Sequence, residues 1–210
     1  MDDLNQEYQR RFRNALKPIA CGIEDLLQEY LKGLPRIDRV SARAKEPLRF
    51  ITKAGKVENG MPKYSDPLSQ IQDQIGARVV VFYERDVVAV SARVEKYFHL
   101  FEKRLQIPET EWEFGYFGLH YVFLLPREAV PTGVSEELAP EQFELQIKTL
   151  WQHAWSEANH VLAYKPSAEL PAGSRRLMAY ASAQAWGADR TFSELFENTE
   201  RGALVPTQST

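Results

Sequence analysis

The segment 143–149 alternates strictly between apolar and polar side chains, and this pattern restricts the fold more than any other stretch of the chain. A strand with such alternation buries one face and turns the other toward solvent or a cleft. The apolar side chains are Phe143, Leu145 and Ile147. The polar side chains are Glu144, Gln146 and Lys148. An acid, an amide and an amine on one face suit the lining of a site, although a half-solvated edge strand gives the same pattern.

The remaining pattern indicates strands in the middle of the chain and helices at both ends. Apolar residues recur at helical spacing over 4–32, 87–105, 149–163 and 173–198, and we expect Pro18 to kink or divide the first of these helices. The other predicted elements are strands at 37–44, 79–83 and 116–125, a short helix at 47–53, a loop at 54–67 and a helix cap at Asp86. This order predicts a mixed α/β fold in which helices cover a sheet of three or more strands.

Composition excludes several classes of protein. A chain of 210 residues with a net charge of −3 and a pI of about 5.9 gives no global electrostatic argument for binding nucleic acid. The single cysteine, Cys21, excludes an internal disulfide and a Cys-rich zinc site, and we expect it as a small core residue of the first helix. The N-terminus is polar and acidic, and no apolar run approaches 18 residues, so we expect a cytoplasmic protein with no membrane span.

Four cations lie where the strand at 37–44 turns into the helix at 47–53. They are Arg43, Lys45, Arg49 and Lys53. Arg49 and Lys53 are four residues apart and share a helix face, next to a helix N-terminus that favours anions. The pattern predicts either an anion site or an ordinary solvated charged face.

Asp73, Gly76 and Arg78 directly precede the apolar strand at 79–83. Charged groups at the end of a buried strand lie where ligands bind in open sheets. An N-capping aspartate followed by a glycine in a tight turn explains the same residues.

Tyr116, Gly118 and His120 share one face of the predicted strand at 116–125. A tyrosine beside a position without a side chain offers a platform for a flat ring, and stacking of a base on an aromatic ring contributes about 1–3 kcal/mol. An amphipathic strand with a structural tyrosine and histidine is the alternative.

The helix after Thr149 carries His153, Glu157 and His160 on one face, at i, i+4 and i+7. This spacing is similar to that of metal ligands, but the HExxH pattern is absent, so a zinc site is the weaker interpretation. We expect the tryptophans of this helix, Trp151 and Trp155, in the core.

Taken in order, these clusters resemble the RelA/SpoT-type alarmone synthetase domain, over a stretch from about Val40 to Lys165. The matching motifs are R-x-K at Arg43–Lys45 with the later Lys53, D-x-x-G-x-R at Asp73–Arg78, G-Y-x-x-x-H at Gly115–His120, E-x-Q-[IV]-[RK]-T at Glu144–Thr149, and a helix that bears His160 and ends at Tyr164–Lys165. Each motif alone is weak, whereas four in register are specific.

The resemblance implies an α+β fold of the nucleotidyltransferase-like synthetase type, in which helices flank a central mixed β-sheet of about five strands. It also implies N- and C-terminal helical extensions. The expected division is an N-terminal extension at 1–35, a synthetase core at 36–166, and a C-terminal helix and tail at 167–210.

The resemblance further implies transfer of the β,γ-pyrophosphate of ATP to the 3′-hydroxyl of GDP or GTP. By this analogy Asp73 and Glu144 coordinate Mg²⁺, and Glu144 accepts the proton of the attacking hydroxyl. The implied ATP-binding residues are Arg43 and Arg78 at the adenine and Lys45 and Lys53 at the triphosphate. The implied acceptor-binding residues are Tyr116, stacked on the base, with His120, Gln146 and Lys148. Two separated acids suit Mg²⁺, which keeps positions for phosphate oxygens.

The chain departs from the family pattern at several positions. Arg49 stands where members commonly carry Ser, and Trp112 and Phe114 stand where Lys and Asn are frequent. Asn159 replaces a Glu that small synthetases often carry before the late His, and Glu157 lies two residues earlier. The ATP half of the site therefore matches the family, whereas the acceptor half is unusual.

Three hypotheses follow. The favoured one is a (p)ppGpp synthetase that lacks the family's hydrolase domain and so makes alarmone without degrading it. The second keeps the chemistry but changes the acceptor to an adenine nucleotide or the 3′ end of a tRNA, as in toxic small relatives. The third is a nucleotide-binding regulator without catalysis, against which the retention of Asp73 and Glu144 argues. An antitoxin partner and a dimer or tetramer formed through the terminal helices stay open, with Tyr8, Phe12 and Leu16 as either contact or core residues.

Overall fold

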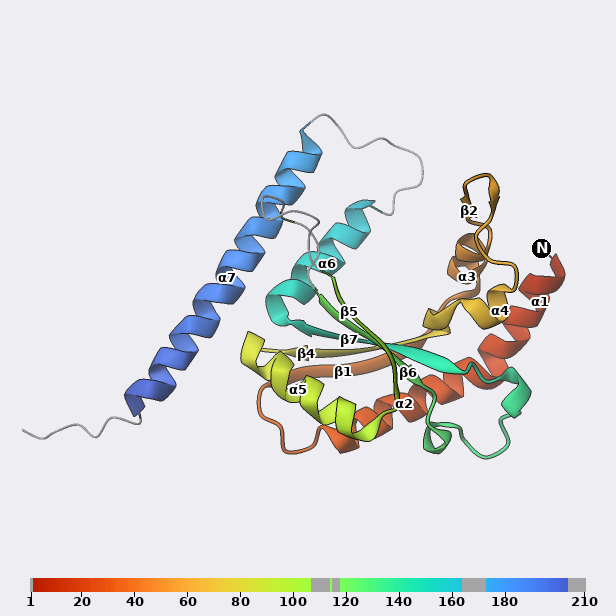
Figure 1. The fold of residues 1–210 in the computed structure, drawn as a ribbon, viewed down its shortest axis with the longest axis horizontal. Helices are drawn as coiled ribbons and strands as arrows, with labels where there is room; N and C mark the ends of the chain where they lie inside the picture. The colour runs from red at the N-terminus through yellow and green to blue at the C-terminus, as the bar shows by residue number, and fades with distance from the viewer. Residues whose placement is uncertain (1, 107–113, 115–117, 164–172, 204–210) are drawn as a thin grey trace, which may run out of the picture.

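A computed structural model describes residues 2–106, 114, 118–163 and 173–203 of the chain (Figure 1). In chain order the elements are α1 (Asp2–Arg11), the π-helical η1 (Phe12–Leu16), α2 (Lys17–Tyr30), β1 (Ile37–Ala44), α3 (Pro47–Ala54), β2 (Val57–Glu58), β3 (Met61–Pro62), α4 (Pro67–Gln70), the 3₁₀ helix η2 (Gln72–Gln74), β4 (Ile75–Val81), α5 (Glu84–Tyr97), β5 (Leu100–Gln106), β6 (Gly118–Leu124), the 3₁₀ helices η3 (Arg127–Ala129) and η4 (Glu136–Leu138), β7 (Gln142–Thr149), α6 (Leu150–Ala163) and α7 (Ser174–Ala203). Within these ranges, no helix is both long and apolar enough to cross a membrane.

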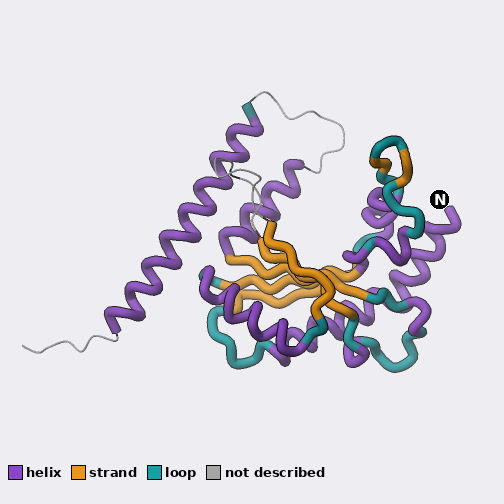
Figure 2. The backbone as a smooth tube through the Cα atoms, in the orientation of Figure 1, coloured by secondary structure: helices purple, strands orange, loops and turns teal. Residues whose placement is uncertain are grey.

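The central sheet has five strands in the order β1-β4-β7-β6-β5. The two inner strands β4 and β7 are parallel, and the other pairs are antiparallel. Helices α2 and α5 lie against one side of the sheet, and α6 rises from the other side (Figures 1 and 2). The expectation of a mixed α+β fold with a five-stranded sheet between helices is confirmed.

The alternation of β7 produces the two faces of this sheet. Phe143, Leu145 and Ile147 have no exposed surface and belong to the main hydrophobic core. Their neighbours in the register, such as Val79 on β4 and Tyr121 on β6, are equally buried. Because residues paired across strands point to the same side, the polar residues of β7 all face away from this core.

The N-terminal helices belong to the same core. Tyr8, Phe12 and Leu16 are buried, so their interpretation as core residues is confirmed and they offer no surface to a second copy of the chain. The Tyr8 ring stacks on Phe50 of α3 at 3.7 Å between centroids, and its hydroxyl donates to the Lys45 carbonyl at 2.8 Å. Helix α1 thereby supports the backbone between β1 and α3.

The division of the first helix falls just before Pro18. Proline has no N–H to donate to the carbonyl four residues earlier, and the helix widens instead into the π-helical turn η1, where the Lys17 N–H donates to the Phe12 carbonyl. Cys21 is exposed, so its expected place in the core is wrong. It lies on the outer side of α2, whose inner side is formed by Ile19, Ile23 and Leu27.

The predicted helix at 87–105 is wrong in its second half. Helix α5 ends at Tyr97, and the chain then forms the edge strand β5, in which Phe101 is 55% exposed. Pairing with β6 decides this conformation, since the apolar residues of the stretch fit helical spacing as well. Asp86 caps α5, but as the third residue of a capping box and not as the residue before the helix, since its carboxylate accepts a hydrogen bond from the Tyr83 N–H at 3.3 Å.

The structure adds two features to the predicted pattern. Strand β4 begins at Ile75, four residues earlier than expected, so Gly76 and Arg78 lie inside the strand. The loop at 54–67 contains the hairpin β2–β3, whose turn residues Asn59 and Gly60 both have positive φ, as hairpin turns of this length require.

The C-terminal helix α7 is held against the far end of β7 and the start of α5. The Thr149 hydroxyl donates to the Asp189 carboxylate at 2.6 Å, and the Ser193 hydroxyl accepts from the Glu84 N–H at 3.2 Å. Burial raises the pKa of Asp189 to about 6. Trp151 of α6 stacks on Phe192 of α7 and stays 38% exposed, so its expected place in the core is wrong.

Candidate active site

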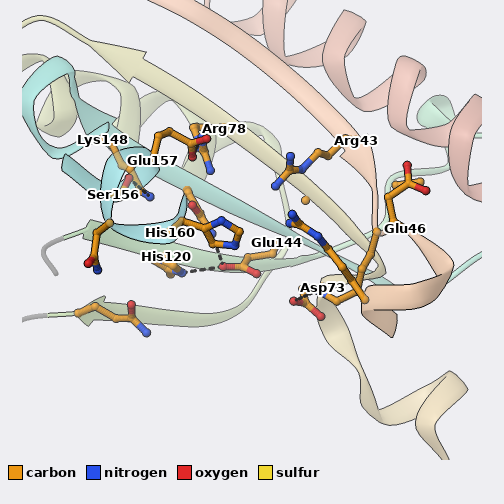
Figure 3. A pocket seen from close by; sticks show the side chains of 17 residues that line it. Arg43, Glu46, Asp73, Arg78, His120, Glu144, Lys148, Ser156, Glu157 and His160 are labelled. Atoms are coloured by element: carbon orange, nitrogen blue, oxygen red, sulfur yellow. Dashed lines mark hydrogen bonds and ion pairs between the residues drawn. The ribbon is translucent and has the colours of Figure 1, made fainter. Parts of the chain in front are cut away.

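The polar face of the sheet forms the floor of a cleft of about 720 Å³ between α3 and α6 (Figure 3). Of the ten residues that the family resemblance assigns to the site, eight line it: Arg43, Lys45, Asp73, Arg78, His120, Glu144, Gln146 and Lys148. Five further residues that the sequence analysis singled out also line it: Arg49, Gly76, Glu157, Asn159 and His160. Lys53 contacts Asp73 at the edge of the cleft. Tyr116 lies outside the described residues. The sequence motifs, which are spread over more than a hundred positions, therefore meet in one place.

Strand register explains how these residues meet. Arg43 on β1 pairs with Gly76 on β4, which pairs with Glu144 on β7. In the next row on the same face, Arg78 pairs with Gln146, which pairs with His120. Two adjacent rows of the sheet thus present all three chemical types, cations, carboxylates and neutral acceptors, to the cleft.

Gly76 creates the hollow between Arg43 and Glu144. A Cβ atom placed at this position would meet no heavy atom within 4 Å, and the backbone has no positive φ there. The interpretation of Gly76 as a tight-turn residue is therefore wrong, because it is an in-strand residue whose missing side chain leaves space above the sheet.

Asp73 is held by two lysines at the α3 end of the cleft. Lys45 Nζ donates to Asp73 Oδ2 at 2.6 Å, and Lys53 Nζ donates to Oδ1 at 3.0 Å. Burial alone would raise the pKa of Asp73, but the two ammonium groups outweigh it and lower that pKa. Asp73 is therefore an ionised carboxylate at neutral pH.

Glu144 lies at the centre of the cleft, between the Arg43 side and the Lys148 side (Figure 3). His120 Nδ1 contacts its Oε1 at 2.6 Å, and Gln146 Nε2 donates to the same oxygen at 3.0 Å. Burial would raise the pKa of Glu144, but these hydrogen bonds outweigh it and lower that pKa. Both contacts fall on Oε1, so Oε2 is the oxygen that can receive a metal or a substrate hydroxyl.

Lys148 is almost fully buried at the other end of the same strand face. Its Nζ lies 3.2 Å from Ser156 Oγ on α6. Burial, together with the positive charge of Arg78, lowers the pKa of Lys148 to about 7. An anionic ligand in the cleft would restore the charged form, because a nearby negative charge favours the ammonium.

Arg78 reaches from β4 to α6. Its NH1 donates to Glu157 Oε1 at 2.7 Å and lies 3.2 Å from His153 Nδ1. The face of α6 that suggested metal ligands thus contacts an arginine through two of its three residues. No group of three or more His, Cys, Asp or Glu side chains suited to a metal ion occurs among the residues that the structure describes.

Two buried carbonyl oxygens in the cleft have no hydrogen-bond donor. They belong to Gln146 Oε1 and Asn159 Oδ1. The orientation of the Gln146 amide is fixed, because its nitrogen must face the Glu144 carboxylate. A buried acceptor without a donor is costly, so these oxygens suit the N–H or O–H groups of a ligand.

The sequence did not single out Gln106 and Ser156, which also line the cleft. Gln106 ends the strand that was predicted as helix, and no local pattern marks it. Ser156 carries no signal of its own, since its place depends on the rotation of α6. Arg49, which departs from the family pattern, lines the cleft as well.

Comparison with known proteins identifies the family. A family model described as "Region found in RelA / SpoT proteins" matches residues 42–169, more than half of the chain. The chain belongs to this family. GTP pyrophosphokinase YjbM of Bacillus subtilis (strain 168) is 28% identical over 200 residues, which cover 93% of this chain and 90% of that protein.

Solved structures of a small alarmone synthetase and of a GTP pyrophosphokinase family protein share the fold. Small alarmone synthetase 1 from Bacillus subtilis matches with a TM-score of 0.70 at 24% identity, over 87% of this chain and 95% of that chain. The same enzyme bound to its product pppGpp matches with a TM-score of 0.64 at 27% identity, over 85% and 87% of the two chains. A GTP pyrophosphokinase family protein from Streptococcus pneumoniae matches with a TM-score of 0.69 at 21% identity, over 87% and 90%.

The RelA/SpoT-type cleft has a donor set that suits a hard divalent cation. Mg²⁺ takes oxygen ligands and is commonly held by one or two carboxylates while substrate phosphates complete its shell. Asp73 and Glu144 are both ionised, line the same cleft and lie close enough for the charge of Asp73 to affect the pKa of Glu144. These residues fit a magnesium ion that is bound together with a nucleotide.

Proposed function

We propose that this chain is an ATP:nucleotide 3′-pyrophosphokinase that transfers the β,γ-pyrophosphate of ATP to the 3′-hydroxyl of GDP or GTP and so makes (p)ppGpp. The observation that supports this most directly is the cleft itself, in which Asp73 and Glu144 lie among five basic side chains, Arg43, Lys45, Arg49, Arg78 and Lys148. Pyrophosphate transfer needs alignment of reactants and neutralisation of charge on oxygen, and this set of residues supplies both.

The donor nucleotide belongs at the β1–α3–β4 side. Lys45 and Lys53 are point charges suited to the triphosphate, and Asp73 holds both until the phosphates arrive. The planar guanidinium groups of Arg43 and Arg78 can stack on the adenine ring. Asp73 and Glu144 would hold Mg²⁺, which neutralises charge on the phosphate oxygens when it is bound.

Glu144 is the proposed base. The 3′-hydroxyl oxygen of the acceptor forms a bond to the β-phosphorus of ATP, the bond from that phosphorus to the α,β-bridging oxygen breaks, and AMP leaves. The hydroxyl proton passes to Glu144, whose ionised state is maintained by the hydrogen bonds from His120 and Gln146.

The acceptor nucleotide belongs at the β6–β7 side. We assign the stacking platform for its base to Tyr116, and we assign His120, Gln146 and Lys148 to its sugar and phosphates. The Gln146 oxygen without a donor suits a ribose hydroxyl, and Lys148 suits a phosphate. The segment with Trp112 and Phe114 sets the acceptor choice in this proposal, and an adenine nucleotide or a tRNA 3′ end is the alternative acceptor.

The test is a thin-layer assay with γ-labelled ATP and Mg²⁺ that offers GDP, GTP, ADP, ATP and bulk tRNA as separate acceptors. We expect label on GDP or GTP, and loss of transfer when Mg²⁺ is removed with a chelator. Label on an adenine nucleotide or tRNA would move the protein to the toxin-like alternative. Absence of transfer to every acceptor, with ATP binding retained, would contradict catalysis by the chain alone and support a regulatory role or a missing activator.

Replacement of Tyr116 by Ala separates the two nucleotides. We expect the KM for the guanine nucleotide to rise by about 10–100-fold, since stacking contributes about 1–3 kcal/mol, while the KM for ATP changes little. Equal increases for both substrates would remove the stacking assignment.

A further inference from the structure

Arg78 has two contacts, and both fall on one nitrogen of its guanidinium group. NH1 meets Glu157 Oε1 at 2.7 Å and His153 Nδ1 at 3.2 Å. Within the described ranges Nε and NH2 have no partner. The side chain is 21% exposed and lines the cleft, so the guanidinium group is open to a ligand there while α6 holds its NH1.

The contact with His153 fixes the state of that histidine. An arginine donates hydrogen bonds and cannot accept them, so Nδ1 must be the accepting nitrogen and the proton of the neutral ring must sit on Nε2. Burial and the charge of Arg78 both lower the pKa of His153, in agreement with a neutral ring. A protonated His153 would have to donate from Nδ1 and would repel Arg78.

His153 and Glu157 lie one helical turn apart on α6, whereas Arg78 comes from β4. A free arginine side chain samples many rotamers, and ordering it on a ligand costs binding free energy. The two contacts on NH1 order the side chain before the ligand arrives, and they leave the rest of the guanidinium group for binding.

We propose that His153 and Glu157 act as a pair of positioning residues that hold Arg78 in place for the base of the donor nucleotide. The pair touches neither the phosphates nor the reacting atoms, and it acts only through Arg78. This inference rests on the proposed function, because the ligand of Arg78 is taken to be the adenine ring of ATP.

The test measures binding without turnover. Isothermal titration of α,β-methylene-ATP and of inorganic tripolyphosphate is compared for the wild-type chain and for Glu157→Gln, which keeps the size of the side chain and removes its charge. We expect the nucleotide to bind about tenfold more weakly to the variant and tripolyphosphate to bind equally to both. Equal weakening of both ligands, or no weakening of the nucleotide, would overturn the proposal.

A double-mutant cycle shows whether the effect passes through Arg78. In an Arg78→Ala background, Glu157→Gln should cause no further loss of nucleotide affinity. A further tenfold loss there would mean that Glu157 acts by another route. Glu194→Gln is the matched control, since it removes an exposed carboxylate that pairs with Arg190 on α7, away from the cleft, and it should change neither ligand.

The pH dependence of binding gives an independent readout for His153. The charged groups that face its ring are Arg78 from β4, Glu157 from its own helix, Arg39 from β1 and Lys148 from β7. Because Lys148 titrates near pH 7 in the same cleft, the profile is compared with that of His153→Gln, which keeps an acceptor and the same Lys148. The ratio of wild-type to variant affinity should hold constant above the pKa of His153, which lies below the usual value of about 6.5, and should fall as the pH drops through it. A ratio that does not change with pH would exclude His153 from the pair.

Failure of this proposal is distinguishable from failure of the proposed function. Wild-type pyrophosphate transfer is measured separately with labelled ATP. If the chain transfers pyrophosphate but binds the nucleotide independently of Glu157 and His153, the proposed function stands and the positioning role of these two residues is wrong. If the binding differences are as expected but no pyrophosphate is transferred, the positioning role stands and the proposed function is wrong.

Discussion

The side chains on the two faces of strand β7 differ in whether the folded chain satisfies all of their contacts. On the core face, Phe143, Leu145 and Ile147 have no exposed surface and meet other side chains of the same chain on every side. On the cleft face, Gln146 keeps a buried oxygen without a donor and Lys148 is a buried amine with a lowered pKa. Folding alone satisfies the contacts of the core face, whereas the polar groups of the cleft face need a ligand to satisfy them.

This difference shows where the chain accepts a loss of stability for function. Burial of an amine and of an unsatisfied amide oxygen costs free energy in the folded state, and sites of this kind are where sequences depart from the most stable choice. The comparison predicts that substitutions on the core face lower stability, and that substitutions on the cleft face lower activity without lowering stability.

The largest expected effect is that of Glu144→Gln. Loss of the proposed base and metal ligand should reduce pyrophosphate transfer by about 10²–10⁴-fold, while the melting temperature stays close to that of the wild type. Rates from the labelled-ATP assay and thermal melts of the same preparations check both parts. Glu141→Gln, an exposed neighbour just before β7, is the control. Turnover within a few-fold of wild type would remove Glu144 from both roles.

Ile147→Ala tests the core face of the same strand. Removal of a fully buried side chain should lower the free energy of unfolding by about 2–5 kcal/mol, because it loses apolar burial and leaves a cavity. Urea denaturation followed by circular dichroism measures this loss. If Gln146→Ala on the cleft face destabilises the chain by as much, the two faces do not differ in the way proposed.

Lys148→Met should stabilise the chain by about 1–3 kcal/mol at pH 7, because a buried amine is replaced by an apolar side chain of similar length. Folding lowers the pKa of Lys148 to about 7 from its usual 10.5, so between these values the unfolded chain keeps a proton that the folded chain releases. Wild-type stability therefore rises with pH across this window. The advantage of the variant should be largest at pH 7 and below and should vanish above about pH 10.5.

Urea melts of wild type and Lys148→Met at several pH values measure this difference. A variant that is less stable than wild type at pH 7 would show that the ammonium is well solvated or paired in the folded state. The same variant should bind the acceptor nucleotide more weakly, which an assay of the KM for the guanine nucleotide checks.

The smallest expected effect on stability is that of Gly76→Ala. The added methyl group meets no protein atom within 4 Å and the backbone conformation is accessible to alanine, so stability should stay equal or rise by about 0.4–1 kcal/mol. The methyl group enters the hollow above the sheet, so affinity for α,β-methylene-ATP should fall. Unchanged affinity would place the nucleotide away from the β1–β4 hollow.

Prediction from the sequence succeeded where a pattern is local. The alternation of segment 143–149 and the cations Arg43 and Lys45 near a helix start are visible within a few residues. The structure places both cations and the polar residues of this segment in the lining of the cleft. The resemblance to the RelA/SpoT family adds what one strand cannot show, since it implies that Asp73 and Glu144 belong to one site.

Prediction failed where distant contacts decide. Whether the stretch after Tyr97 continues as a helix depends on pairing of β5 with β6, which no window of the sequence contains. In the sequence, Gly76 after Asp73 could not be told from a glycine in a tight turn, whereas the structure has it inside β4. The contacts of Arg78 with His153 and Glu157 join residues 75 and 79 positions apart and depend on how α6 is rotated over the sheet.

The hydrogen bond from Tyr8 to the Lys45 carbonyl joins positions that are 37 residues apart. A chain trimmed by a protease after its first helix would keep every motif residue and still lose the hydroxyl that bonds the backbone carbonyl of Lys45, the residue proposed to bind the triphosphate. An expression tag fused rigidly to that helix can shift Tyr8 and so disturb the same hydrogen bond to Lys45. Batches that differ only in the integrity of their first ten residues should therefore differ in their affinity for ATP.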